Sequence, residues 1–414
     1  MTSQMRRRVP GTALLLAVLG MLIAALPNNP AAAAPNPPPR PMTAANPGAF
    51  TLQWGNDRRA QARSLRRAVN PLNSSGTHRV TVGSMLDAAD HRARTQSDPN
   101  CASNATSAAH NGALRGAHAT EFYCLNSVDT VTNRWTPQGV SGTEDARAAG
   151  TVDNHHAIVF SWHHSGSNQH GTRLSFLDRA TNRYINVLLV EPDPAGTDYS
   201  EVDTHAGGIV WYQNYIFVAG PQSGVRVFDT TNLLRLSNNP KGNISPTCQT
   251  GLRNGRYCGR GYHYLLPEIG QWINRAPATR YDSMSLERAP GRTDFLTSEY
   301  RENSVGRVAR WTNTSMISFQ GVIHPYRAWH QPVRYVQGAF SRGCYYFDMG
   351  GGFSGNRYLV WANATGNTTP RWQRGGRGLQ DLYWLRSANQ LWTLTEHPGI
   401  YSRFLYGVHR PACP

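Results

Sequence analysis

The sequence predicts an all-β protein with a β-propeller fold, and we expect five blades. The first observation is a recurring phrase, in which an apolar strand opens with a small or amide residue and leads through a turn into an aromatic strand. The second is that more short strands follow each opening, which is typical of small sheets arranged around an axis. The openings lie at 137–140, 205–212, 282–286, 336–340 and 379–384. Their spacing of about 43 to 77 residues is uneven and leaves room for a sixth, degenerate blade.

The remaining strands follow each opening in order. We expect them at 156–162, 173–176 and 184–190, at 215–218 and 225–229, at 294–300 and 307–311, at 344–347 and 358–361, and at 390–395 and 404–408. The second blade also carries a long excursion at 236–272. The fifth blade is one strand short, and segment 122–135 is placed to supply it. Such closure would remove the open sheet edges that otherwise template aggregation.

Residues 1–33 have the pattern of a secretory signal peptide. Three arginines at positions 6 to 8 precede an apolar stretch at 13–26, and small residues at 31–34 supply a cleavage site. The apolar stretch is shorter than the roughly 18 residues that a membrane-spanning helix needs. Sec-type export is favoured, with the twin-arginine route as the alternative. The sequence therefore predicts a secreted, extracellular protein without a membrane span.

Between the signal peptide and the propeller we expect a linker and an arm. Residues 34–48 are rich in proline and indicate an extended linker. The arm that follows, up to residue 121, is polar and weakly patterned, and we expect it to be irregular. Arg59, Arg63, Arg66 and Arg67 share the face of a short helix at helical spacing. The propeller would then occupy 122–414.

All six cysteines lie in the mature chain. An even number in an exported protein predicts disulfides, and six cysteines allow 15 connectivities. The simplest arrangement pairs neighbours: Cys101 with Cys124, Cys248 with Cys258, and Cys344 with Cys413. No C-x-x-C motif is present, so a structural zinc site has little support.

The chain is strongly basic. Its formal charge of +16 falls to +13 without the three arginines of the signal peptide, and Lys241 is the only lysine. Such a charge attracts polyanions, among which acidic glycans or cell-wall polymers are better candidates than nucleic acid. The alternative is an arginine-biased composition with no particular partner. We expect a monomer.

Several short segments of the sequence resemble those of a group of secreted bacterial β-propeller proteins of unknown function. These are the residues at 205–208 and 211–212, at 224–229, at 298–301, at 337–338 and at 395–398. The resemblance covers roughly 138–408. It implies the fold and secretion, but it carries no catalytic residues. The Gly-x-Ser-x-Gly, His-Glu-x-x-His and Asp-x-Asp-x-Asp-Gly motifs of other functional classes are absent from the sequence.

Three residues are candidates for catalysis. His205 opens an innermost strand, where an imidazole can act as a general base or instead bond a backbone carbonyl. Glu299 and Glu396 each lie near the end of a second strand and would form a carboxylate pair if both face one rim. The alternative is that repetition explains both glutamates, each satisfying the same backbone donors.

A second set of polar residues flanks the innermost strands. Gln138, Asp282, Gln337 and Asp381 are candidate ligand-binding residues at the mouth of the axial channel, and Gln380 lies beside them. Their oxygens would suit calcium, although the set has few acids. Water-filled polar packing is the alternative to a metal site. No other cofactor is expected.

We therefore expect a protein that binds a carbohydrate or another small polar ligand at the axial mouth. One alternative is an enzyme of lactonase, lyase or glycosidase type, and another is an interaction scaffold without a small-molecule site. Trp211, Trp311, Trp361, Trp384 and Trp392 are expected in the core. Trp329 and Trp372 lie in less regular segments and are expected to be more exposed.

Overall fold

The chain is described by a computed structural model that covers residues 35, 37–165, 171–350, 357–365, 368–397 and 403–414. The predicted signal peptide lies outside these residues. Residues 34–414 form one compact unit, separate from residues 1–33. This unit is built almost entirely of short antiparallel strands, as the sequence predicts for an all-β protein. Among the described residues, no helix is long and apolar enough to cross a membrane.

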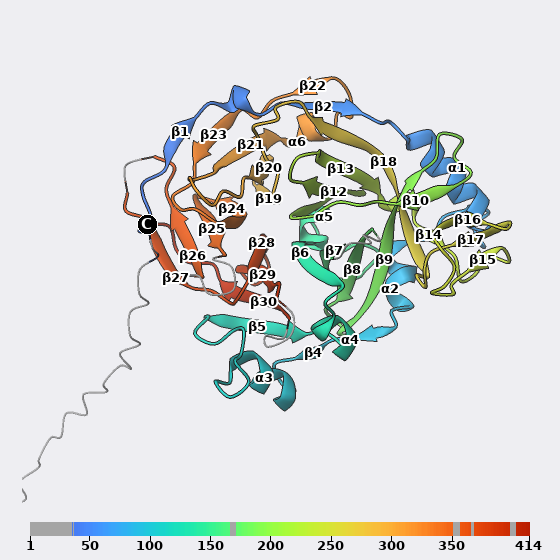
Figure 1. Ribbon diagram of the computed structural model, residues 1–414, viewed down its shortest axis with the longest axis horizontal. Coiled ribbons are helices and arrows are strands. Elements are labelled where there is room, and N and C mark those ends of the chain that lie inside the picture. The colour runs from blue at the N-terminus through green and yellow to red at the C-terminus, as the bar shows by residue number, and fades with distance from the viewer. Residues whose placement is uncertain (1–34, 36, 166–170, 351–356, 366–367, 398–402) are drawn as a thin grey trace, which may run out of the picture. The chain divides into compact units, whose positions relative to one another are not determined.

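Paired strands run outward from a common centre (Figure 1), and we call each run of four neighbouring strands, from the centre outward, a group, numbered in chain order. The inner strands are β6 (Trp135–Gly142), β11 (Ile209–Tyr212), β19 (Ser283–Ala289), β24 (Val336–Arg342) and β28 (Leu379–Leu385). The second strands are β7 (Ala157–His164), β12 (Tyr215–Gly220), β20 (Arg292–Ser298), β25 (Cys344–Met349) and β29 (Gln390–Thr395). The third strands are β8 (Thr172–Asp178), β13 (Gly224–Asp229), β21 (Arg307–Thr312), β26 (Tyr358–Ala362) and β30 (Phe404–His409). The outer strands are β9 (Arg183–Pro192), β18 (Tyr264–Asn274), β23 (Arg327–His330), β27 (Arg371–Arg374) and β5 (Ala119–Cys124).

Strand β18 joins the first two groups into one continuous sheet. Its first half pairs in parallel with β9, with Tyr264 opposite Val187, and its second half pairs antiparallel with β13, with Trp272 opposite Val225. This strand lies at the end of the segment that we expected to be an excursion. Strand β14 (Leu234–Arg235) directly precedes that segment, and the rest of the segment holds β15 (Gly242–Asn243), β16 (Gly251–Arg253) and β17 (Arg256–Cys258).

The N-terminal arm follows the outside of the ring and is more regular than the sequence suggests (Figure 1). Its short strands β1 (Thr43–Ala45), β2 (Leu52–Gly55), β3 (His91–Arg92) and β4 (Arg94–Thr95) pair with β23, β18, β9 and β5 in turn. Each outer strand offers unpaired backbone groups, so a segment without strand periodicity becomes a strand by pairing there. The arm also contains η1 (Pro47–Ala49), α1 (Arg59–Val69), α2 (Val82–Asp87) and α3 (Pro99–Thr106).

Helix α1 confirms the helical spacing of the arginines. Its buried face consists of Ala62, Leu65 and Val69, while Arg63 and Arg67 are exposed. Arg63 and Arg67 therefore lie on a solvated face, whereas the half-buried Arg66 donates to the carbonyl of Thr231 and to Asn232. The remaining short elements are α4 (Ser127–Val131), α5 (Thr143–Ala146), α6 (Asn313–Met316), η2 (Thr230–Asn232), β10 (Tyr199–Glu201) and β22 (Val322–Ile323).

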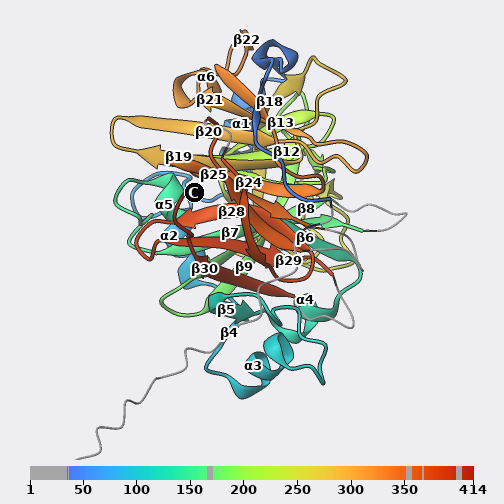
Figure 2. The ribbon, with the colours of Figure 1, turned by 90° about the vertical axis from the view of Figure 1, so that its left-hand side faces the viewer.

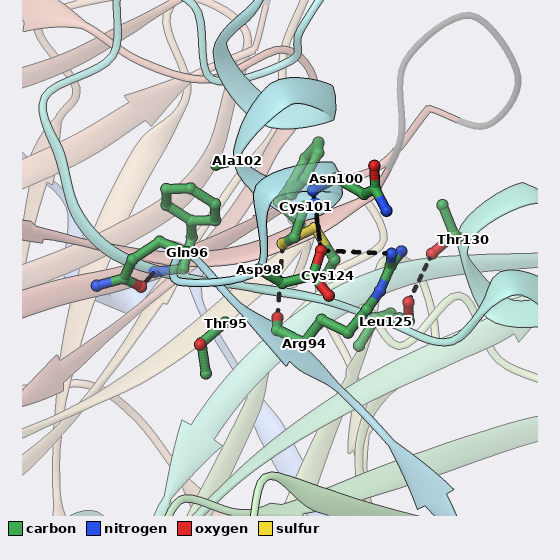
Figure 3. Close-up of a disulfide and its surroundings, with 12 residues drawn as sticks. Arg94, Thr95, Gln96, Asp98, Asn100, Cys101, Ala102, Cys124, Leu125 and Thr130 are labelled. Atoms are coloured by element: carbon green, nitrogen blue, oxygen red, sulfur yellow. Dashed lines mark hydrogen bonds and ion pairs between the residues drawn. A yellow bond between two sulfur atoms is a disulfide. The ribbon is translucent and has the colours of Figure 1, made fainter.

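The fifth group is completed from the N-terminal side of the chain. Strand β5 pairs with β30, with Cys124 opposite Phe404 and Tyr123 opposite Leu405 (Figure 2). The closing strand thus overlaps the start of the predicted segment 122–135. Figure 3 shows how its end is fixed: the Cys101–Cys124 disulfide ties β5 to α3, whose first turn donates two backbone hydrogen bonds to Asp98. The disulfides Cys248–Cys258 and Cys344–Cys413 complete the predicted neighbour pairing.

Aromatic side chains fill the space between adjacent groups. Trp211, Trp311, Trp361 and Trp392 are buried, as predicted, whereas Trp384 is half-buried. Trp329 is buried beside Tyr345, so the expectation of exposure was wrong for this residue. Strand β23, which carries Trp329, lies between β21 and β1, and this pairing removes it from the surface.

Candidate functional site

The inner strands meet backbone to backbone at the centre of the ring. The residues that make these contacts lie within an inner strand or directly before it. They are Gly139, Gly208, Ser283, Gly338 and Asp381. A Cβ atom on Gly139 would lie 2.9 Å from the Cα of Gly208, and one on Gly338 would lie 2.5 Å from the Cα of Asp381. A side chain at Gly208 would collide with the amide of Met284. Small residues are therefore required here because neighbouring strands touch.

Asp381 takes the place of a glycine and ties three inner strands together. It is completely buried and has a positive φ of 53°. Its Oδ2 accepts hydrogen bonds from the backbone N–H of Val140 at 3.0 Å and of Ile209 at 3.2 Å. Burial raises the pKa of Asp381 well above its usual range, and the neighbouring Asp348 adds to this shift. The predicted ligand-binding residue Asp381 thus lies in the packed centre, beneath the mouth.

Three polar residues from two neighbouring groups form one hydrogen-bonded set, in which Gln138 and Gln380 are buried and Glu396 is partly exposed. We call this set, together with His205, the rim. The side-chain amide of Gln138 donates to Oε1 of Glu396 at 3.1 Å, and that of Gln380 donates to Oε2 at 2.9 Å. The His397 Nδ1 lies 3.9 Å from the same Oε2. The Glu396 side chain keeps 23% of its surface exposed. The carboxylate is therefore positioned by neutral amides while solvent still reaches it.

Two histidines from neighbouring groups lie side by side. The rings of His163 and His205 lie 4.5 Å apart, and His163 Nδ1 lies 3.2 Å from the carbonyl oxygen of His205. Desolvation by the surrounding protein and the charge of Arg280 lower the pKa of His205 to about 4. Desolvation and the neighbouring His205 lower the pKa of His163 to about 4 as well. Both imidazoles are therefore uncharged at neutral pH.

The His205 ring is open to a ligand. The residue is exposed, yet nearby protein atoms partly desolvate the ring and lower its pKa. Within the described ranges its ring nitrogens form no hydrogen bond. The predicted alternative, a bond from the His205 ring to a backbone carbonyl, is thus not formed there. It is the ring of His163 that contacts a carbonyl, that of His205 itself.

Asp282 and Glu299 are held by arginines instead. Arg280 bonds both oxygens of Asp282 at 2.9 and 2.6 Å, and the backbone N–H of Tyr300 donates to the same carboxylate at 2.8 Å. Burial nevertheless raises the pKa of Asp282. Glu299 accepts two bonds at 2.7 Å from the guanidinium of Arg307. Burial alone would raise the pKa of Glu299, but bonding to Arg307 outweighs it and lowers the pKa.

Gln337 lies apart from these bonded sets. It is half-buried, and its Cγ would be 3.1 Å from a Cβ atom at Gly350. Of the predicted site residues, the structure joins Gln138 directly to Glu396, and it links Asp282 to Glu299 through Arg280, whose backbone N–H also donates to Glu299. The field of Glu396 contributes to the raised pKa of Tyr300, whose amide bonds Asp282.

Sequence reasoning did not assign a role to His163, Arg280 or Arg403. His163 lies on β7 and contacts His205 of the neighbouring group, a proximity that no local spacing in the sequence displays. The i, i+2 spacing of Arg280 and Asp282 is a usable signal for an ion pair on one face of an extended segment. In the parts of the chain that the structure describes, no cluster of three or more His, Cys, Asp or Glu side chains could hold a metal ion. Calcium therefore stays a prediction.

The chain matches no known protein family and no curated protein sequence. Among solved structures, 51 chains match. A glucose dehydrogenase is 11% identical with a TM-score of 0.27 over 62% of this chain and 79% of that one. A GH43_1 enzyme from Xanthomonas citri is 8% identical with a TM-score of 0.33 over 69% and 93%. A hydrazine synthase from Kuenenia stuttgartiensis is 9% identical with a TM-score of 0.29 over 65% and 79%.

Proposed function

We propose that this chain is a secreted, five-bladed β-propeller that binds a carbohydrate or another small polar ligand at the rim formed by Gln138, His205, Gln380 and Glu396. One observation carries the proposal. The Glu396 carboxylate is held by two amides, is partly exposed, and forms no ion pair with a guanidinium among the described residues. A buried arginine partner would neutralise this charge. Because Glu396 forms no such pair among the described residues, its carboxylate can accept hydrogen bonds from a ligand.

The chemistry of this rim matches a polyol. A carboxylate accepts hydrogen bonds only, a side-chain amide both donates and accepts, and an uncharged imidazole does the same through its two nitrogens. Adjacent sugar hydroxyls also donate and accept, so they can satisfy the carboxylate and the imidazole together, while the buried amides of Gln138 and Gln380 orient the carboxylate. A few convergent polar groups that fix orientation are typical of small-molecule sites.

The blade number is supported by contacts that pass from strand to strand around the centre. The glycine contacts join β6 to β11, β11 to β19 and β24 to β28, and Asp381 joins β28 back to β6. The remaining step is made by Ser285, whose hydroxyl donates to the carbonyl of Ala339 at 2.5 Å. Three disulfides fit an oxidising, extracellular environment, and the leader-like residues 1–33 support export.

The test is a calorimetric titration with a panel of neutral and acidic oligosaccharides. The Glu396→Gln variant keeps the shape of the side chain but removes the charge, and we expect it to weaken binding by about tenfold or more, since hydrogen bonds to charged groups contribute ~1.5–3 kcal/mol. Asp87→Asn is the control because its carboxylate is exposed on α2, far along the chain from the rim. Equal affinities for both variants and the wild type would refute the proposal.

An enzyme of lactonase, lyase or glycosidase type is a second candidate, and one observation favours it. His205 is uncharged at neutral pH, accessible and without a hydrogen-bond partner on its ring in the described part of the chain, as a general base must be. Glu299 is a poor acid for such a reaction because Arg307 stabilises its ionised form. The test uses a ligand that the wild type cleaves. If His205→Ala binds this ligand normally but leaves it intact, His205 acts in catalysis.

A further inference from the structure

The outer strand of the fourth group differs from the four other outer strands. Strands β9, β18, β23 and β5 each have a strand of the N-terminal arm along their outer side. Among the described residues, no strand pairs with the outer edge of β27 (Figure 1). The edge has the sequence Arg371-Trp372-Gln373-Arg374, and its arginines disfavour pairing with a second copy because like charges would face each other.

A cleft of about 820 Å³ lies beside this edge. Its walls are formed by Trp361 of β26, Trp372 and Arg371 of β27, the 368–370 connection and Pro414. Trp361 is buried and supports one wall, while Trp372 is half-buried and keeps part of its ring accessible. The Cys344–Cys413 disulfide and the hydrogen bond from Asn363 to the carbonyl of Pro414 fix the far wall. The cleft is therefore built from anchored segments.

Arg371 carries the one charged side chain among the described residues that line the cleft. No acidic residue lines it, and the exposed Arg371 forms no ion pair with any carboxylate of the described residues. A guanidinium binds a carboxylate through two parallel hydrogen bonds, and an accessible indole offers a flat apolar face. The positive charge of the whole mature chain adds long-range attraction for anions.

We propose that this cleft is a second binding site, distinct from the rim, for an acidic oligosaccharide whose sugar rings carry carboxylates. A pyranose ring would lie against Trp372 while its carboxylate pairs with Arg371. The hydroxyls of Thr368 and Thr369 border the same space and suit the remaining sugar hydroxyls. An acidic peptide would satisfy Arg371 but would leave the flat face of Trp372 without a matching ring.

The test is a fluorescence titration of the full chain with a galacturonate hexamer and, as the neutral probe, maltohexaose. The wild type should prefer the acidic hexamer. Arg371→Gln should weaken that binding by about tenfold and remove the preference, since a charge-assisted bidentate pair is lost. Trp372→Ala should weaken the binding of both probes. Arg371 is exposed, so its replacement leaves the fold intact.

Two controls locate the site. Arg374→Gln removes the same charge from the same strand at a residue that does not line the cleft, and it should bind the hexamer like the wild type. Asp87→Asn changes an exposed carboxylate on α2 that does not line the cleft, and it should also bind the hexamer normally. Equal losses in Arg371→Gln and Arg374→Gln would show that the hexamer responds only to basic surface charge and would overturn the proposal. The absence of binding in the wild type would also overturn it.

Discussion

Glu299 and Glu396 lie in corresponding parts of two groups and meet opposite surroundings. Each directly follows the last residue of a second strand, Ser298 of β20 or Thr395 of β29. Glu299 is 1% exposed and bonded to the guanidinium of Arg307, whereas Glu396 is held by two glutamine amides and partly exposed. The same residue type at the end of the same kind of strand thus serves structure in one group and stays available in the other.

The arginine that follows each glutamate explains why Glu299 is paired and Glu396 is not. Arg307 opens the third strand of its group and turns its guanidinium onto the Glu299 carboxylate. Arg403, just before the third strand of its own group, donates instead to the carbonyl oxygen of Glu396 at 2.8 Å and to that of Asp129 at 3.3 Å. Its guanidinium lies 5.7 Å from the ring of Trp162. The buried contacts of Arg403 with a neighbouring group therefore leave the carboxylate of Glu396 without a guanidinium ion pair among the described residues.

The largest effect is expected for Glu299→Gln. This change leaves Arg307 without its anion in a mostly buried site, and breaking such a pair costs about 3–5 kcal/mol. Glu396→Gln should change the free energy of unfolding by less than about 1 kcal/mol, as is typical of partly exposed charges. Urea unfolding of both variants measures the contrast. Equal destabilisation would contradict the division between a structural and an available glutamate.

A smaller effect is expected at the centre of the ring. Asp381→Ala leaves the N–H groups of Val140 and Ile209 without an acceptor. A buried unsatisfied group lowers the free energy of unfolding by about 1–3 kcal/mol. Asp381→Asn keeps an acceptor oxygen, and because burial already favours the uncharged acid, we expect near wild-type stability. If Asn is as destabilising as Ala in the same unfolding experiment, the charge of Asp381 stabilises the fold, as the charge of Glu299 does.

The smallest effect is a dependence of stability on pH. The pKa of His163 and His205 is lowered to about 4 in the folded state, so protons bind the unfolded chain first as the pH falls. Stability should decline between the unfolded pKa of about 6.5 and pH 4. Glu299, whose pKa is lowered, loses its contribution only below about 4.3. Melting curves of a His163→Gln, His205→Gln double variant should lack the first decline and keep the second.

The fold was more accessible to sequence reasoning than the site. The small residues that open the inner strands recur because neighbouring backbones touch there, so Gly139 and Gly338 carry a steric requirement that the sequence displays. Strand β18 was missed because its two halves belong to different groups, and Pro267 and Gly270 interrupt its pattern. The arm strands were missed because they form only against an existing edge.

The site depends on contacts between distant parts of the chain. Gln138 and Glu396 are separated by 258 positions, and no local pattern predicts their hydrogen bond. Glu299 and Glu396 looked alike in sequence because each is followed by an aromatic or imidazole residue and later by an arginine. Only the three-dimensional direction of Arg307 and Arg403 separates the two environments.

Spectra of isotope-labelled histidine test the central claim most directly, because they report whether a ligand reaches the rim. The wild type is titrated at neutral pH with the oligosaccharide that binds best in calorimetry. We predict that the imidazole signals of His205 and His163 shift together and saturate at the calorimetric affinity, and that neither shifts in Glu396→Gln. Binding by calorimetry with both signals unmoved in the wild type would contradict the assignment of the rim as the ligand site.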